Sequence, residues 1–173
     1  MEEGTMNATA APKLTMRPHL PADAPLLAAI FRASVEELTS DDYSAAQQEA
    51  WAAVADDEAA FASRLAGQTT LVALLQGSPV AFASLKGADA IDMLYVHPAA
   101  ASLGAATMLI DALEKLAGAR GAQKLTVEAS DTAHDFFKTR GFVPMQRNTV
   151  ARGGEWLANT TMEKLLAGKA APQ

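Results

Sequence analysis

The chain has 173 residues, of which 50% are apolar and 20% are charged, so it is long enough for one globular domain with a hydrophobic core. Its net charge of −6 argues against nucleic-acid binding, which needs a basic surface. The absence of cysteine excludes disulfides, thiolate metal ligands and cysteine nucleophiles, and it fits a reducing compartment, so we expect a cytoplasmic protein. No apolar run approaches the roughly 18 residues of a membrane span, so no membrane partner is expected.

The pattern of apolar residues and turn formers predicts a single α/β domain over residues 12–166. Residues 1–11 start acidic and are expected to form a disordered leader, and residues 167–173 a flexible tail. The predicted elements are, in chain order, a strand at 13–17, helices at 21–38, 40–54 and 57–67, strands at 69–76, 80–87 and 90–96, a helix at 104–118, a strand at 124–130, a helix at 131–141 and a hairpin that turns at Gly153–Gly154. This order predicts a mixed central sheet of about seven strands with helices on both faces.

The junction between the strand at 90–96 and the helix at 104–118 holds no acid, base or metal ligand. The first turn of a helix has unpartnered N–H groups and a partial positive charge, and small side chains let a pyrophosphate approach them. Ser102 is a candidate helix cap, Gly104 leaves room, and Ala105 and Ala106 expose their amides. The same features fit a loop that only connects two elements, and the turn alone leaves both interpretations open.

Several segments in order carry a family resemblance: "LYVHP" with the loop after it, "LIDALEKLA", and "VEAS" followed by "FF" and "GF". Together they resemble the GNAT superfamily of N-acetyltransferases, whose loop reads Gln/Arg-x-x-Gly-x-Gly/Ala. Here the loop runs from Ala101 through Gly104 to Ala106, so the last two marked positions match and the first departs. The segments "DYSAAQQEAWA" and "LANTTMEK" are similar to a YafP-like branch of the superfamily, with Thr160 as a departure. The residues that fit this branch are Tyr43, Gln47, Trp51, Asn159 and Met162.

The resemblance implies a GNAT-type fold and the transfer of an acetyl group from acetyl-CoA to a primary amine of a small molecule, by direct attack through a tetrahedral intermediate. Acetyl-CoA would be the co-substrate. No metal is expected, because the three histidines are scattered. The residues that the resemblance places against the coenzyme are Leu94, Tyr95, Val96, Ser102, Leu103, Gly104, Ala105, Ala106, Thr107, Ser130, Asp131, Phe136 and Phe137.

The chemistry requires a neutral amine, and a lysine-like amine of pKa near 10.4 is neutral in only about one molecule in 2,500 at pH 7. The resemblance makes the carboxylate of Asp92 the candidate base, although on its own Asp92 also fits a solvent-facing strand residue. It places the backbone donor for the developing oxyanion at Val96 or near it. Phe137 stands where many relatives carry a tyrosine acid, so we expect no side-chain acid from this helix, and a thiolate leaves readily without one.

Several of these residues also fit purely structural roles. Tyr43, Trp51 and Trp156 are candidates for an aromatic wall around the acceptor amine, or for residues that seal the core. Leu94 also fits the hydrophobic core, as do Phe136 and Phe137, and Ser130 and Asp131 fit a helix cap.

Three functions stay open from the sequence: a small-molecule N-acetyltransferase, a protein or peptide N-acetyltransferase, and a non-catalytic acyl-CoA-binding module. Ala101 and Phe137 favour the third function, whereas Asp92 opposes it. The sequence is compatible with acetyl or longer acyl groups, and with a monomer or a homodimer.

Overall fold

The computed structural model describes residues 13–166, and the predicted leader and tail lie outside them. The helices and strands follow the predicted order. Their bounds are β1 (Leu14–Pro18), α1 (Ala24–Leu38), α2 (Ala45–Ala52), α3 (Glu58–Ala66), β2 (Thr69–Leu75), β3 (Ser78–Lys86), β4 (Ala90–Val96), α4 (Ala105–Ala119), β5 (Lys124–Ser130), α5 (His134–Thr139), β6 (Val143–Arg152) and β7 (Glu155–Leu165). The prediction of a helix from residue 40 is wrong at its start. The α2 helix begins at Ala45 because Ser44 caps it, accepting the N–H of Gln47 while the Gln47 side chain accepts the N–H of Ser44.

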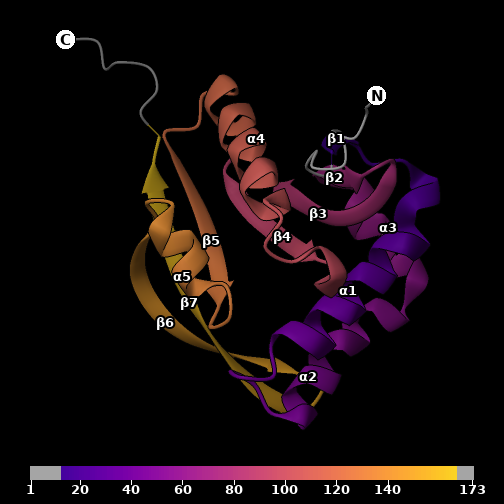
Figure 1. Cartoon of the computed structure of the whole chain (residues 1–173). Helices are drawn as coiled ribbons and strands as arrows, with labels where there is room; N and C mark the ends of the chain where they lie inside the picture. Colours follow the sequence, from indigo (N-terminus) through magenta and orange to yellow (C-terminus); the bar gives the residue numbers. More distant parts are fainter. Residues whose placement is uncertain (1–12, 167–173) are drawn as a thin grey trace, which may run out of the picture.

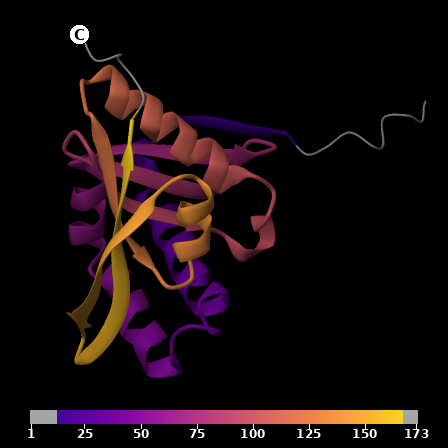
Figure 2. The same cartoon turned by 90° about the vertical axis from the view of Figure 1, so that its left-hand side faces the viewer.

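The seven strands form one sheet in the order β1-β2-β3-β4-β5-β7-β6, in which β4 and β5 are the parallel pair. One core lies between the sheet and α4 with α5, and it includes Leu109, Leu113 and Phe137. A second core lies between the opposite face and α1, α2 and α3, and it includes Phe31 and Phe61. Figures 1 and 2 show these two layers of helices on either side of the sheet. The predicted mixed sheet with helices on both faces is confirmed.

A β-bulge interrupts β4 in its middle. Ser84 lies opposite Met93 and Leu85 opposite Ile91, so Asp92 is the extra residue on β4. Regular alternation would place Ile91 and Met93 on one face, but Ile91 packs in the core under α4 and Met93 in the core under α1 and α3. The bulge therefore reverses the facing of every later residue of β4.

The pairing between β4 and β5 is short. Only Ala90 with Thr126 and Ile91 with Val127 are partners, and beyond them the two strands separate, as Figure 1 shows. At the far end the β6–β7 hairpin curves to meet α2 (Figure 1). The sheet is thus split beyond Ile91, and the opening lies beside the loop that precedes α4.

Candidate active site

A cavity of about 600 Å³ occupies the opening between β4 and β5 and extends to the start of α4; we call it the cleft. Its lining includes most of the residues that the sequence resemblance placed against a coenzyme. They are Leu94, Tyr95, Val96, Ser102, Gly104, Ala105, Ala106, Thr107, Ser130, Phe136 and Phe137. The two phenylalanines also belong to the core or pack against it, so the predicted structural role and a position at the cleft hold together for both.

The start of α4 presents its backbone to the cleft. The first hydrogen bond of the α4 ladder runs from the N–H of Met108 to the carbonyl of Gly104, so the amides of Ala105, Ala106 and Thr107 precede the ladder. Gly104 is the N-cap, with φ +95°, and a Cβ placed on it would meet nothing within 4 Å. The prediction that Ser102 caps α4 is wrong: no side chain caps this helix, because the N-cap residue is a glycine. The first turn of α4 is therefore open to an anion.

The backbone of β4 also faces the cleft. The N–H of His97 donates to the carbonyl of Val80 on β3 at 2.8 Å. Hydrogen-bonding residues alternate along an antiparallel pair, so Val96, one residue earlier, directs its N–H away from β3. On that side β5 has already separated from β4. An N–H donor at the predicted position, Val96, thus points into the opening.

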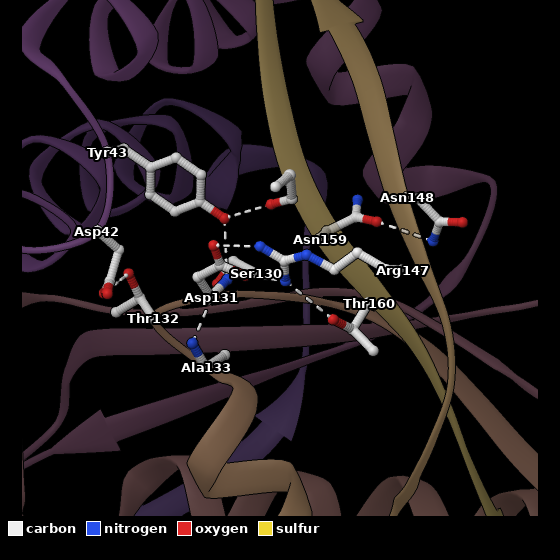
Figure 3. A network of polar contacts seen from close by, with 11 residues as sticks. Asp42, Tyr43, Ser130, Asp131, Thr132, Ala133, Arg147, Asn148, Asn159 and Thr160 are labelled. Carbon is white, nitrogen blue, oxygen red and sulfur yellow. Dashed lines mark hydrogen bonds and ion pairs between the residues drawn. The ribbon is translucent and has the colours of Figure 1, made fainter.

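Two predicted contacts of the coenzyme do not line the cleft. Leu103 is 43% exposed on the loop before α4. The carboxylate of Asp131 instead accepts hydrogen bonds from both terminal nitrogens of Arg147, at 2.5 and 2.9 Å. Arg147 also donates to the hydroxyl of Thr160, so this ion pair joins the β5–α5 turn to β6 and β7 (Figure 3). The role of Asp131 in the structure is to anchor that turn. Ser130 lines the cleft, and its hydroxyl also accepts the N–H of Ala133 within the turn.

The hydroxyl of Tyr43 connects three elements in the same network (Figure 3). It donates to the carbonyl of Ala158 on β7 at 2.6 Å and accepts the N–H of Asp131 at 2.9 Å. Next to it, Thr132 donates to Asp42 at 2.8 Å. Burial raises the pKa of the Tyr43 phenol, so it stays protonated and keeps its donor. Tyr43 therefore ties the segment before α2 to the β5–β7 half of the sheet, on the far side of the split.

A second cavity, of about 320 Å³, lies between the β5–β7 half of the sheet and α1, α2 and β4; we call it the side pocket. The β5–β7 wall presents the polar side chains of Thr126, Glu128, Ser130, Asn159 and Thr161, together with apolar residues such as Leu157. The other wall is aromatic and presents Phe31, Trp51 and Tyr95, with ring centroids 4.6 Å apart for Phe31 and Tyr95 and 6.3 Å apart for Trp51 and Tyr95. Trp51 donates its indole N–H to the Tyr95 hydroxyl at 3.3 Å. The side pocket is thus shaped for a small molecule with an apolar part and a polar group.

The three aromatic residues predicted to surround the acceptor lie in different places. Tyr43 and Trp51 line the side pocket, and Tyr43 also seals the core with its ring edge-to-face on Trp51. Trp156 lies outside both cavities and is 64% exposed, because it points away from the side pocket on the edge hairpin. The structure therefore brings two of the three aromatics together and leaves the third apart.

The cleft and the side pocket share residues at the point where β4 and β5 separate. Among them are two carboxylates, Asp92 and Glu128. Oδ2 of Asp92 accepts the Nε–H of Arg64 and the amide of Gln68, both at 2.8 Å. Burial alone would raise the pKa of Asp92, but these hydrogen bonds and the charge of Arg64 hold it below its usual value. Asp92 therefore lies where the two cavities meet, in an ion pair with Arg64 that the sequence did not predict.

Several lining residues of the side pocket were missed from the sequence. Arg64 and Glu128 lie in predicted elements, and nothing in their local pattern marks them. Lys86 and Arg152 are charged residues at strand ends, a common place for solvated side chains. The pairing of the strands, together with the packing of α3 on the sheet, brings these four residues to one cavity.

The residues that the structure describes contain no helix long and apolar enough to cross a membrane. Within 13–166 there is also no group of three or more side chains arranged to hold a metal ion.

Comparison with known proteins agrees with this geometry. Residues 39–166 match the acetyltransferase (GNAT) domain. The chain is 35% identical over 149 residues to the uncharacterized N-acetyltransferase YafP of Escherichia coli strain K12, covering 86% of this chain and 94% of YafP.

Solved structures extend the comparison. The crystal structure of a GCN5-related N-acetyltransferase from Rhodopseudomonas palustris, which also carries the name aminotransferase, class-II, is 65% identical, with a TM-score of 0.87 over 94% of this chain and 100% of the other. The PaiA N-acetyltransferase of Thermoplasma acidophilum in complex with coenzyme A shares the fold at 17% identity, with a TM-score of 0.75 over 88% of this chain and 99% of that one. The chain therefore belongs to the GNAT family and is an N-acetyltransferase of that family.

Proposed function

We propose that this enzyme transfers the acetyl group of acetyl-CoA to the primary amine of a small molecule. The observation that carries the proposal is that two cavities of different character meet where β4 and β5 separate. One has backbone donors and an open helix start, and the other has polar and aromatic side chains. A thioester held in the first cavity and an amine held in the second would meet at the shared wall.

The residues of the cleft fit coenzyme A as a substrate. The amides of Ala105, Ala106 and Thr107 would bind its pyrophosphate, because they precede the hydrogen-bond ladder of α4 and carry the positive end of the helix dipole. Gly104 leaves the approach free, since no side chain stands there. The backbone of β4 near Leu94 and Val96, turned toward the opening, would bind the pantetheine arm.

The side pocket supports a small acceptor. Its volume of about 320 Å³ is at the lower end of the range for ligand sites, and it is walled by strands and helices on several sides. A flat or cationic amine would pack against Trp51 and Tyr95, whose rings attract positive charge.

Two residues of β4, Val96 and Asp92, lie where the acetyl transfer would take place. The nitrogen lone pair attacks the thioester carbonyl carbon, and the N–H of Val96 stabilises the oxyanion that forms. The C–S bond breaks and the thiolate leaves. Asp92 as the base that removes the amine proton remains a prediction, and its pairing with Arg64 makes its carboxylate a weaker base than an unpaired one would be.

A thiol-release assay with acetyl-CoA and a panel of small amines tests the proposal. We expect thiol release that depends on the amine and saturates with it. Thiol release that occurs only with peptides would indicate that the acceptor is a protein or a peptide. Coenzyme binding without release from any acceptor would instead indicate a non-catalytic acyl-CoA-binding module.

A further inference from the structure

Glu128 lies at the boundary of the two cavities. It is the residue of β5 directly after Val127, where pairing with β4 ends, and it lines both the cleft and the side pocket. Its neighbours Val127 and Ala129 are buried in the core under α4. Side chains alternate along a strand, so Glu128 projects to the other face, into the side pocket.

Glu128 differs from Asp92, the other carboxylate at this boundary, in its partners. Asp92 is bound by Arg64 and Gln68. Among residues 13–166, Glu128 forms neither an ion pair nor a side-chain hydrogen bond, and it remains exposed to the cavity. An unpaired carboxylate next to an aromatic wall is complementary to a protonated amine.

The other charged and titratable groups of the side pocket come from four elements and from the segment before α2, and they decide which charges lie near Glu128. They are Arg64 on α3, Lys86 on β3, Asp92 and Tyr95 on β4, Arg152 on β6, and Tyr43 before α2. Arg64 is held by Asp92, and burial raises the pKa of both Tyr43 and Tyr95, so neither phenol ionises near pH 7. Lys86 and Arg152 carry positive charge and repel an ammonium. Glu128 is therefore the negative group in the side pocket that is not already paired.

We infer that Glu128 binds the ammonium group of the acceptor and takes its proton before acetyl transfer, an inference that rests on the proposed function. The ammonium N–H bond breaks, its proton passes to the Glu128 carboxylate directly or through one water, and the nitrogen keeps the electron pair. That pair forms the C–N bond to the acetyl carbonyl carbon. The C–S bond breaks and its electron pair leaves on the coenzyme sulfur, and the thiolate takes the second proton of the acylated nitrogen, directly or through water, to give the amide and free coenzyme A. Asp92 in this scheme holds Arg64 in place and stays ionised.

The test compares Glu128→Gln with Asp92→Asn in the thiol-release assay, using an alkylamine and an aromatic amine that is already neutral at pH 7. Glu128→Gln should lower kcat/KM for the alkylamine by about 100-fold at pH 7, the usual contribution of a general base. The loss should shrink as pH rises toward the alkylamine's pKa, and it should be much smaller for the aromatic amine. Asp92→Asn should show no such dependence on the acceptor.

Two controls keep the result specific. Glu163→Gln makes the same chemical change on β7 outside both cavities, where Glu163 pairs with Lys124, and it should leave turnover unchanged. Coenzyme A affinity, measured by calorimetry, reports whether the Glu128→Gln variant is folded.

The outcomes separate the inference from the proposed function. If the wild type is active and Glu128→Gln stays within about twofold of it for both amines, Glu128 is not the base and the inference is overturned. If the wild type binds coenzyme A but none of the amines tested causes thiol release, the proposed function fails and the role of Glu128 fails with it.

Discussion

The cleft and the side pocket meet at one edge, but they are built in opposite ways. The cleft is lined mainly by one stretch of chain, from Ile91 on β4 to Thr107 in α4, and by the β5–α5 region, with α1 and Trp51 at its side. Its donors for the coenzyme are backbone amides of that stretch. The side pocket uses side chains from α1, α2, α3, β3, β4, β5, β6 and β7. A site of backbone donors depends on local conformation, whereas a site of side chains depends on the whole fold. The two regions should therefore respond differently to substitution.

The largest effect is expected at Gly104, where a substitution should weaken the binding of coenzyme A and leave the binding of the acceptor amine unchanged. Gly104→Val should weaken coenzyme A binding by about 100-fold, or about 2.7 kcal/mol, because a side chain would enter the anion site. Gly121→Val is a matched control: Gly121 has φ +91° and equally open surroundings, but lies after the other end of α4. Both variants should carry the same backbone strain. Calorimetry would contradict this account if the two variants bound coenzyme A equally well.

Tyr43 tests whether the network in Figure 3 holds the segment before α2 against the β5–β7 half of the sheet. Tyr43→Phe leaves the carbonyl of Ala158 and the N–H of Asp131 without their partner, so it should destabilise the fold by about 1–3 kcal/mol. Tyr95→Phe loses only a long hydrogen bond from Trp51 and should cost about 0.5 kcal/mol. Urea unfolding of both variants measures the difference. Equal losses would show that the Tyr43 hydroxyl does not tie the segment before α2 to that half of the sheet.

Asp92 provides a pH test of its ion pair. The pKa of Asp92 lies below its usual value because hydrogen bonds from Arg64 and Gln68 outweigh the effect of burial. The ionised Asp92 therefore stabilises the folded state at pH values above its unfolded pKa, near 3.9. This stabilisation is lost as pH falls through the lower pKa of the folded state. Asp92→Asn should destabilise the protein by about 1–2 kcal/mol at pH 7. The gap from wild type should narrow as pH falls below about 4. A gap that is constant with pH would mean that the ion pair adds no stability.

The smallest effect is expected at Trp156, which lies outside both cavities. Trp156→Ala should change stability by less than about 0.5 kcal/mol and leave the KM for the amine unaltered. Trp51→Ala, in the side pocket, should raise that KM. A raised KM in the Trp156 variant would place it at the acceptor after all.

The same contrast explains what the sequence could predict. The order of helices and strands along the chain, the α4 helix and the open turn at Gly104 follow from local patterns. Most of the residues predicted to contact the coenzyme line the cleft. The bulge at Asp92 could not be predicted, because it appears only in the register with β3. The pairing of Asp92 with Arg64 and the position of Glu128 also depend on which elements pack together. Trp156 was assigned to the pocket from residue type alone, and residue type does not determine which face of β7 a side chain takes.

The most direct test of the central claim, that the separated strands hold coenzyme A on one side and an amine on the other, is an amide chemical-shift titration with coenzyme A. The account predicts that the largest shifts fall at Leu94–Val96 and Gly104–Thr107, while Glu128 and Trp51 respond mainly when an amine is added afterwards. Saturation with coenzyme A that leaves the amides of 104–107 unmoved would contradict it.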